Sequence, residues 1–387
     1  MTIENCIMTK RIYLDHAATT PVHPSVVRAM RPYFDRYFGN PSSIHSHGID
    51  ARAAIETARS KVAALIGSNA NEIVFTGSGT EADNLAIKGI AGSLPDRGNH
   101  IITSSIEHPA VLESCKYLQS RGFEVTYLPV DSDGLVNPKD IEEATTDRTI
   151  LISIMHANNE IGTIEPVAEI GRIAKDRGIY FHCDAVQTAG HIPIDVSKLD
   201  VDLMAMSAHK LYGPKGIGAL YIRKGTKIVP LIHGGAQERG LRSSTENVPA
   251  IIGFGEASSI ALRELHMEMT RLTPMRDRLI AGLLQKIDGV RLNGHPSQRL
   301  PNNVSLSFKF VGGEALLRSL DRQGIAASTG SACSGGKSHA SHVLLATGVP
   351  CDASNGSLRL TLGRTTTADD IERVIGILPG IIDELRE

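Results

Sequence analysis

Four short segments of the chain carry residues that could do chemistry. The first, FTGSGTEA at 75–82, reads as a strand end, a glycine-rich turn and a helix start. Backbone N–H groups and the helix dipole make such a turn an anion site, to which Thr80 can add a hydroxyl. The spacing Gly77-x-Gly79-x-x-Ala82 also fits a dinucleotide fingerprint, but a plain strand-to-helix turn is an equally good interpretation. A P-loop is excluded because no lysine follows at the required position.

The second segment, HCDAVQ at 182–187, ends an apolar strand. Open α/β sheets bind ligands at such strand ends, so Asp184 is a candidate binding residue. The competing interpretation is an N-cap for a following helix. A metal site built from His182, Cys183 and Asp184 is disfavoured because adjacent strand residues point to opposite faces.

The third segment, MSAHKLYGPKGIG at 206–218, places Lys210 just after an apolar strand. A lysine becomes nucleophilic near neutral pH when it is desolvated or has a cationic neighbour. Ser207 and His209 lie beside it in the sequence. Lys215 and Lys224 fit solvated loop positions better.

The fourth segment, STGSACSGGKSH at 328–339, holds a lone cysteine among small polar residues, with a lysine and a histidine nearby. Such loops are exposed and nearby cations lower a thiol's pKa, so Cys333 is a candidate nucleophile. Cys115 and Cys183 lie in apolar surroundings and are predicted to be buried. A zinc site around Cys333 is disfavoured because a fourth ligand is missing at a usual spacing.

Composition excludes several classes of protein. The 387 residues include 40 basic and 42 acidic side chains, a net charge of −2 that offers no field for nucleic acid. No apolar run is long enough to span a membrane, and the N-terminus lacks the apolar stretch of a signal peptide. The five cysteines form no CxxC pair, which argues against a disulfide framework and favours the reducing cytoplasm.

The elements that must position these segments alternate between strand and helix. Apolar runs predict seven strands, at 73–75, 101–103, 125–128, 150–155, 179–183, 203–207 and 219–222. Helical periods predict helices at 50–66, 82–90, 110–121 and 167–177. This alternation predicts βαβ units and a mostly parallel sheet covered by helices on both faces.

The C-terminal part predicts a second, smaller domain. A helix-rich stretch at 247–287, interrupted by Pro274, leads into it. Strands are expected near 304–308 and 358–362, and helices at 313–323 and after a capping box that begins at Thr367. We expect a large domain at 15–255 and a small one at 256–387, with residues 1–14 packed on the small one.

Taken together and in this order, the segments resemble the pyridoxal-phosphate-dependent cysteine desulfurases of the NifS/IscS type, within the class-V aminotransferase superfamily. The resemblance covers essentially the whole chain, and the full set of motifs in order is highly specific. The motifs are YLDHAATTP at 13–21, FGNPS at 38–42, EH at 107–108, NNEIG at 158–162, DAVQ at 184–187, SAHK at 207–210, QERGLR at 237–242, GSAC at 330–333 and SLRLTLG at 357–363.

The resemblance implies fold-type I, the aspartate-aminotransferase-like α/β fold: a large domain with a mainly parallel seven-stranded sheet and a smaller C-terminal α/β domain. It implies removal of sulfur from L-cysteine, giving L-alanine and a persulfide on Cys333. It also implies a cytoplasmic homodimer with neither a membrane nor direct nucleic-acid contact. The sulfur acceptor would be an iron–sulfur scaffold of the IscU/NifU kind, or a carrier for tRNA thiolation. No resident metal is implied, although Cys333 would hand sulfur to, or transiently ligate, a cluster on that partner.

Roles for individual residues follow from the resemblance alone. Lys210 would form the Schiff base with pyridoxal 5′-phosphate, and Asp184 would pair with its ring nitrogen. The remaining cofactor contacts would be Gln187 to the ring hydroxyl, His108 stacked on the ring and moving protons, Gly79, Thr80, Ser207 and His209 around the phosphate, and Thr245 reaching that phosphate from the partner subunit. The substrate carboxylate would be held by Asn40, Asn159 and Arg359, of which the arginine can bind it bidentately.

The chain departs from the family pattern at three places. Gly77 and Ser78 are exchanged in the phosphate turn, Ser244 replaces a glycine before Thr245, and Gly335 replaces a serine common in the cysteine loop. Phosphate binding is expected to persist because Thr80 and Thr245 are kept. A selenocysteine lyase or an aminotransferase would share Lys210 and Asp184 without needing Cys333. A dinucleotide oxidoreductase would leave Lys210 and Cys333 without a purpose. A non-catalytic scaffold subunit would be expected to have lost Lys210 or Cys333, and both are present.

Overall fold

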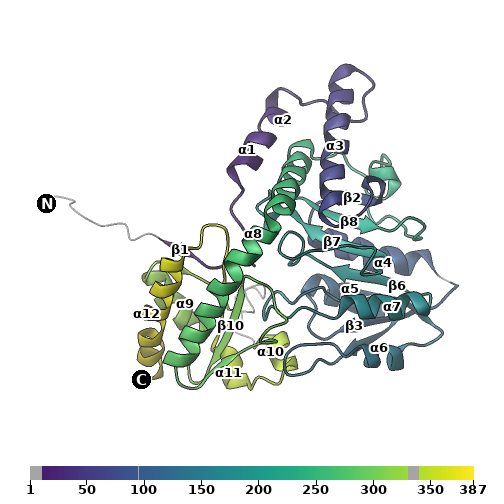
Figure 1. The fold of residues 1–387 in the computed structure, drawn as a ribbon. Helices are drawn as coiled ribbons and strands as arrows, with labels where there is room; N and C mark the ends of the chain where they lie inside the picture. Colours follow the sequence, from purple (N-terminus) through teal and green to yellow (C-terminus); the bar gives the residue numbers. More distant parts are fainter. Residues whose placement is uncertain (1–10, 95, 330–339) are drawn as a thin grey trace.

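The computed structural model describes residues 11–94, 96–329 and 340–387 (Figure 1). Its largest sheet has seven strands in the order β2-β8-β7-β6-β5-β3-β4. They are β2 (Ile73–Thr76), β3 (His100–Ser104), β4 (Glu124–Leu128), β5 (Thr149–Ser153), β6 (Tyr180–Asp184), β7 (Leu203–Ser207) and β8 (Gly218–Ile222). Strand β8 runs in the opposite direction to the other six strands. The predicted mainly parallel seven-stranded α/β sheet is confirmed.

Helices cover both faces of this sheet, as its nearly continuous apolar strands require. One face packs against α4 (Gly79–Ser93) and α5 (Pro109–Gln119) through one core cluster. The other face packs against α3 (Ser46–Leu65), α6 (Pro138–Ala144), α7 (Val167–Asp176) and the first half of α8 (Val248–Lys286). Successive strand residues such as Ile101 and Ile102 belong to different clusters, because side chains alternate across a sheet.

The chain ends build a second layer with its own core. Strands β9 (Val290–Leu292), β10 (Asn303–Phe308) and β12 (Ser357–Thr361) form an antiparallel sheet, while β1 (Ile12–Tyr13) pairs with β11 (Ile325–Ala326). Helices α9 (Gly313–Arg322) and α12 (Ala368–Arg386) and the second half of α8 pack there, and Thr367 forms the expected capping box. The shorter elements are α1 (Pro24–Met30), α2 (Pro32–Asp35), α10 (His342–Ala346), α11 (Cys351–Asn355) and the 3₁₀ turns η1 (Ala70–Glu72), η2 (Ala208–Lys210) and η3 (Glu238–Gly240). Within the described ranges, no helix combines the length and apolarity needed to cross a membrane.

The expected interruption at Pro274 is wrong. Helix α8 runs unbroken for 39 residues with Pro274 inside it (Figure 1). A proline removes one helical hydrogen bond, but here the helix is held at both ends by tertiary packing, on α3 and on α12. The division at 255/256 stays a prediction, and it falls inside this helix.

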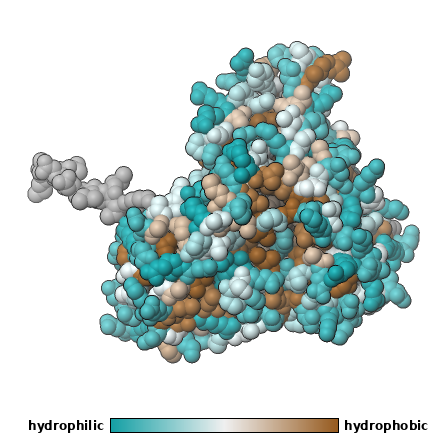
Figure 2. All heavy atoms as spheres, viewed as in Figure 1, coloured by the Kyte–Doolittle hydropathy of each residue, from teal (hydrophilic) through white to brown (hydrophobic). Residues whose placement is uncertain are grey.

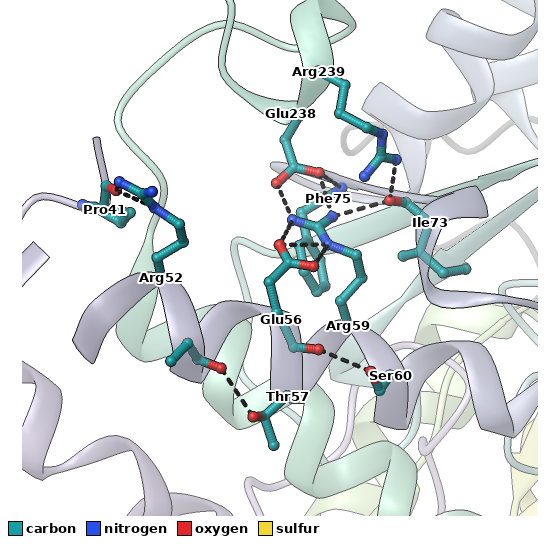
Figure 3. A network of polar contacts seen from close by, with 11 residues as sticks. Pro41, Arg52, Glu56, Thr57, Arg59, Ser60, Ile73, Phe75, Glu238 and Arg239 are labelled. Atoms are coloured by element: carbon teal, nitrogen blue, oxygen red, sulfur yellow. Dashed lines mark hydrogen bonds and ion pairs between the residues drawn. The ribbon is translucent and has the colours of Figure 1, made fainter. Parts of the chain in front are cut away.

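Charged side chains, rather than another strand, cover the outer edge of β2 (Figure 3). The Glu238 carboxylate accepts from Phe75 N at 2.8 Å, while Arg59 and Arg239 donate to the carbonyl of Ile73 at 3.0 and 2.6 Å. The Arg59 guanidinium also donates two hydrogen bonds, of 2.6 and 2.8 Å, to the Glu238 carboxylate. The buried Arg59–Glu238 pair therefore satisfies the exposed strand edge and ties the η3 turn to the sheet.

Replacing Arg59 with methionine should destabilise the fold by about 3–5 kcal/mol, because Glu238 would remain buried without its charge partner. Chemical unfolding of the purified protein measures this loss. The double variant Arg59→Met/Glu238→Gln should recover part of it, since no charge is then left unpaired.

The matched control is Arg148→Met, which breaks a pair with Glu124 in which both side chains are 55% exposed. This change should leave the unfolding midpoint nearly unchanged, since exposed pairs contribute little. An Arg59→Met variant as stable as the control would contradict the role given to the buried pair.

Candidate active site

A cavity of about 340 Å³ opens where the first turn of α4 meets the ends of β6 and β7. Asp184 is the last residue of β6, Ser207 the last of β7 and Gly79 the first of α4. Open α/β sheets bind ligands at such strand ends. The residues that line the cavity are Ala17, Ala18, Ser78, Gly79, Thr80, Asp83, His108, Met155, Ala157, Asn159, Asp184, Val186, Gln187, Ser207, His209, Lys210 and Arg359.

The first turn of α4 forms one wall as a cradle for an anion. Ser78 caps the helix by accepting from Glu81 N at 3.1 Å, which leaves the N–H groups of Gly79 and Thr80 without an acceptor inside the helix. A Cβ on Gly79 would lie 2.7 Å from Val186 Cγ2 and 3.3 Å from Ser207 Cβ, so a glycine is required. Thr80 and Ser207, which line the same cavity, add hydroxyl groups to the N–H groups and dipole of the helix start, and these are the groups that a phosphate site needs.

Lys210 lies in η2 with its amine against the N-terminal segment. Its Nζ donates to the carbonyl oxygens of Ala17 and Ala18 at 2.6 and 2.9 Å. Gln187 Nε2 also donates to Ala17 O, at 3.1 Å, and His209 Nδ1 lies 3.2 Å from the hydroxyl of Thr19. The 17–19 segment therefore aligns the groups that face the cavity. Sequence reasoning assigned it no role, because backbone carbonyls leave no signal in residue type.

Asp184 is buried at the cavity wall, and its Oδ1 accepts from Val186 N at 2.9 Å. Burial raises the pKa of this carboxyl above its ordinary value, and His108, the Val186 hydrogen bond and Lys210 offset only part of that rise. The N-cap interpretation is wrong, because a turn rather than a helix follows at 186–188. The carboxyl group of Asp184 is thus not used to cap a helix and is available to a bound group.

His108 is the N-cap of α5, and its Nδ1 accepts from Ala110 N at 3.1 Å. The neutral ring therefore carries its proton on Nε2. Burial lowers the pKa of His108, against an opposing effect of Asp184, so the ring is neutral at physiological pH. Burial lowers the pKa of His209 to about 4, with Lys210 and Lys215 adding to the effect.

Arg359 closes the far side of the cavity from β12. Its guanidinium donates to Asn159 O at 2.9 Å, to the Ser328 hydroxyl at 2.8 Å and to Asp15 Oδ1 at 3.1 Å. Its Nε is buried and has no acceptor within the described residues. This orientation leaves a fixed cation with donor capacity to spare, which suits recognition of a carboxylate.

The cavity brings together ten of the thirteen predicted site residues: Gly79, Thr80, His108, Asn159, Asp184, Gln187, Ser207, His209, Lys210 and Arg359. Asn40 is exposed and accepts from Ser42 N at 2.9 Å, away from this lining. Thr245 lines a separate pocket of about 190 Å³ beside Gly77 and Arg242. Cys333 lies outside the described residues.

Some features of the cavity were missed by sequence reasoning. Asp83, Met155 and Val186 line the cavity, yet helical or strand spacing offered no sign that they would.

Cys115 and Cys183 are buried, as predicted. In the parts of the chain that the structure covers, no cluster of three or more His, Cys, Asp or Glu side chains is arranged to hold a metal ion.

Comparisons with known proteins agree with this geometry. The family model of class-V aminotransferases matches residues 12–374. The chain is 55% identical over 379 residues to "Cysteine desulfurase IscS" of Dictyoglomus turgidum, covering 98% of this chain and 96% of that one. It is 56% identical over 392 residues to the protein of the same name from Methanosarcina thermophila, covering 100% and 97%.

A solved structure titled "NIFS-LIKE PROTEIN" superposes with a TM-score of 0.91 at 41% identity, covering 97% of this chain and 100% of that one. The fold and the sequence therefore match those of these relatives over nearly the full length of the chain. The chain belongs to the class-V aminotransferase family and, within it, to the cysteine desulfurases of the NifS/IscS type.

Proposed function

We propose that this chain removes sulfur from L-cysteine with the help of pyridoxal 5′-phosphate and releases L-alanine. The observation that carries the proposal is the convergence of Lys210, Asp184 and the first turn of α4 on one cavity. The names of its full-length relatives support the same activity.

The cavity residues fit this cofactor. The cradle at Gly79 and Thr80, with Ser207 and His209, would hold the phosphate, and Lys210 would hold the aldehyde carbon. Asp184 would pair with the ring nitrogen, Gln187 would bond the ring hydroxyl and His108 would lie against the ring. The chemistry supplied by the cofactor, when bound, is withdrawal of electrons from the Cα and Cβ of an amino acid.

The side chains of the cavity would then divide the remaining work. Arg359 and Asn159 would hold the carboxylate of L-cysteine, and the Lys210 amine would remove the Cα proton. Neutral His108 would move protons at the substrate. We also propose that Asn40, although it does not line the cavity in this structure, helps to bind the carboxylate of L-cysteine.

Sulfur would leave through Cys333. Its thiolate would attack the substrate sulfur, so that the Cβ–S bond breaks and an S–S bond forms. L-cysteine and the Cys333 thiol would become L-alanine and a Cys333 persulfide, with all atoms retained. The persulfide sulfur would pass, in the cytoplasm, to an iron–sulfur scaffold or to a tRNA-thiolation carrier.

Lys210→Ala should reduce alanine formation from L-cysteine by several orders of magnitude, because the covalent anchor and the Cα base are lost together. Chromatographic quantitation of alanine and sulfide measures this. The matched control, Lys215→Ala, removes an exposed lysine five positions along and should keep full turnover. Retained alanine formation by the Lys210 variant would sink the proposal.

Arg359→Lys should raise the KM for L-cysteine by about 30-fold or more, because a desolvated bidentate pair contributes roughly 2–5 kcal/mol. Lysine keeps the charge but loses the planar fork. Cofactor affinity, followed by absorbance, should change little in this variant. An unchanged KM would locate the carboxylate-binding group elsewhere.

A homodimer is proposed on two observations. Thr245, expected at a phosphate, lines a pocket other than the cavity of its own chain. Large apolar side chains are also exposed around α2 and the start of α3, with Phe38 68% and Ile44 91% exposed, and brown surface marks this tip in Figure 2. Exposed apolar groups of this kind mark interaction surfaces.

Sedimentation velocity should give the mass of two chains at micromolar concentration. Phe38→Asp combined with Ile44→Asp should shift the protein toward the monomer, because two charges would be buried in the contact. The control is Phe310→Asp, which changes an exposed phenylalanine two residues after the end of β10. A wild-type monomer, or a double variant that stays as dimeric as the control, would refute this contact.

A further inference from the structure

The cavity contains a second buried carboxyl that the proposed function does not use. Asp83 lies on α4, four residues after Gly79, and is 1% exposed at the cavity wall. His182 lies two residues before Asp184 on β6, so both side chains project from the same face of the sheet, toward α4. Asp83 therefore faces His182 and Asp184 together.

Contacts around Asp83 are few. Its Oδ1 is 3.5 Å from His182 Nε2, and neither atom has a hydrogen-bond partner within the described residues. The other ring nitrogen of His182 lies 2.9 Å from the Ser153 hydroxyl. Within the ranges the structure covers, no lysine or arginine forms an ion pair with Asp83.

This geometry argues against a charged pair. A histidinium–carboxylate contact closes to about 2.7–2.9 Å, shorter than the 3.5 Å found here. A buried carboxylate without a cation is also costly, and it would stand beside the carboxylate of Asp184. An uncharged Asp83 beside an uncharged His182 avoids both costs and requires no short contact between the two side chains.

The surroundings of Asp83 and His182 also favour the uncharged form of both side chains. Burial raises the pKa of Asp83, and the carboxyls of Asp184 and Glu107 raise it further. Burial lowers the pKa of His182 to about 3. Burial also raises the pKa of Glu107 to about 8.

We propose that Asp83 is an uncharged carboxylic acid beside His182, which leaves the negative charge of the cavity on Asp184. The Lys210 amine acts electrostatically on Asp184 and lowers the pKa of that carboxyl, whereas no lysine or arginine among the described residues forms an ion pair with Asp83; Asp184 is therefore the carboxyl better placed to carry the charge. The inference deepens the proposed function only in that a bound ring nitrogen would meet one carboxylate rather than two. The charge state of Asp83 itself is a property of the chain alone.

The test compares the wild type with Asp83→Asn, an uncharged side chain of the same shape, by unfolding the cofactor-free protein from pH 4 to 8. A folded-state proton on Asp83 is released on unfolding above about pH 4, so rising pH must favour the unfolded wild type. The ratio of unfolding constants, wild type over variant, should therefore rise by up to tenfold per pH unit. An ionised Asp83 paired with His182 predicts the opposite trend near pH 4, and that result would overturn the proposal.

Glu165→Gln is the matched control, because Glu165 is another buried carboxyl whose pKa burial raises to about 8, and it does not line the cavity. It should show the same trend in stability with pH. Because Glu107 and Glu165 also contribute carboxylic-acid bands at pH 7, the readout is the infrared difference spectrum, wild type minus Asp83→Asn; it should contain a carboxylic-acid band, and a difference spectrum without one would overturn the proposal.

Two further readouts separate this proposal from the proposed function. Affinity of the cofactor-free protein for pyridoxal 5′-phosphate should stay within about threefold in Asp83→Asn, and a tenfold loss would show that a charge on Asp83 is used. If that variant does not fold, ¹⁵N spectra of the wild type, assigned with His182→Gln, should show a neutral His182 ring from pH 5 to 8; a protonated ring would overturn the proposal. Absence of alanine formation would defeat the proposed function and leave the stability and spectroscopic results intact.

Discussion

The close approach between the first turn of α4 and the ends of β6 and β7 is the constraint on which the site depends. Any side chain at Gly79 would collide with Val186, so the helix start reaches the strand ends only because this residue is a glycine. That contact sets the anion cradle beside Asp184 and Lys210. The large sheet, buried on both faces, holds all three elements rigidly.

The charged residues of the cavity come from both layers of the molecule. Arg359 is fixed from β12, on the second layer, while Lys210 and Asp184 come from the large sheet. A substrate bound through both sides would span the two layers. The buried Arg59–Glu238 pair acts elsewhere, at the β2 edge, and serves the fold rather than the chemistry (Figure 3).

Residue type and local pattern were sufficient to predict β7 at its observed bounds and β6 to within one residue at each end, and to place the start of α4 at 82, three residues after its observed start at Gly79. Residue type and local pattern did not predict features that depend on tertiary packing. Helix α8 continues through Pro274 because both halves are buried in different cores, which local propensity does not reveal. Asp83 looked like an ordinary helical position, and its meeting with His182, 99 positions away in the sequence, depends on the register of α4 on the sheet.

The central claim is that this cavity splits L-cysteine into L-alanine and a sulfur atom transferred to Cys333. Incubation of the wild-type protein with cofactor and ³⁴S-labelled L-cysteine, followed by peptide mass spectrometry and amino-acid analysis, tests it directly. The account predicts one labelled sulfur on the Cys333 peptide and alanine formed in equal amount during the first turnover. Label on Cys183 or Cys351 instead, or pyruvate in place of alanine, would contradict it.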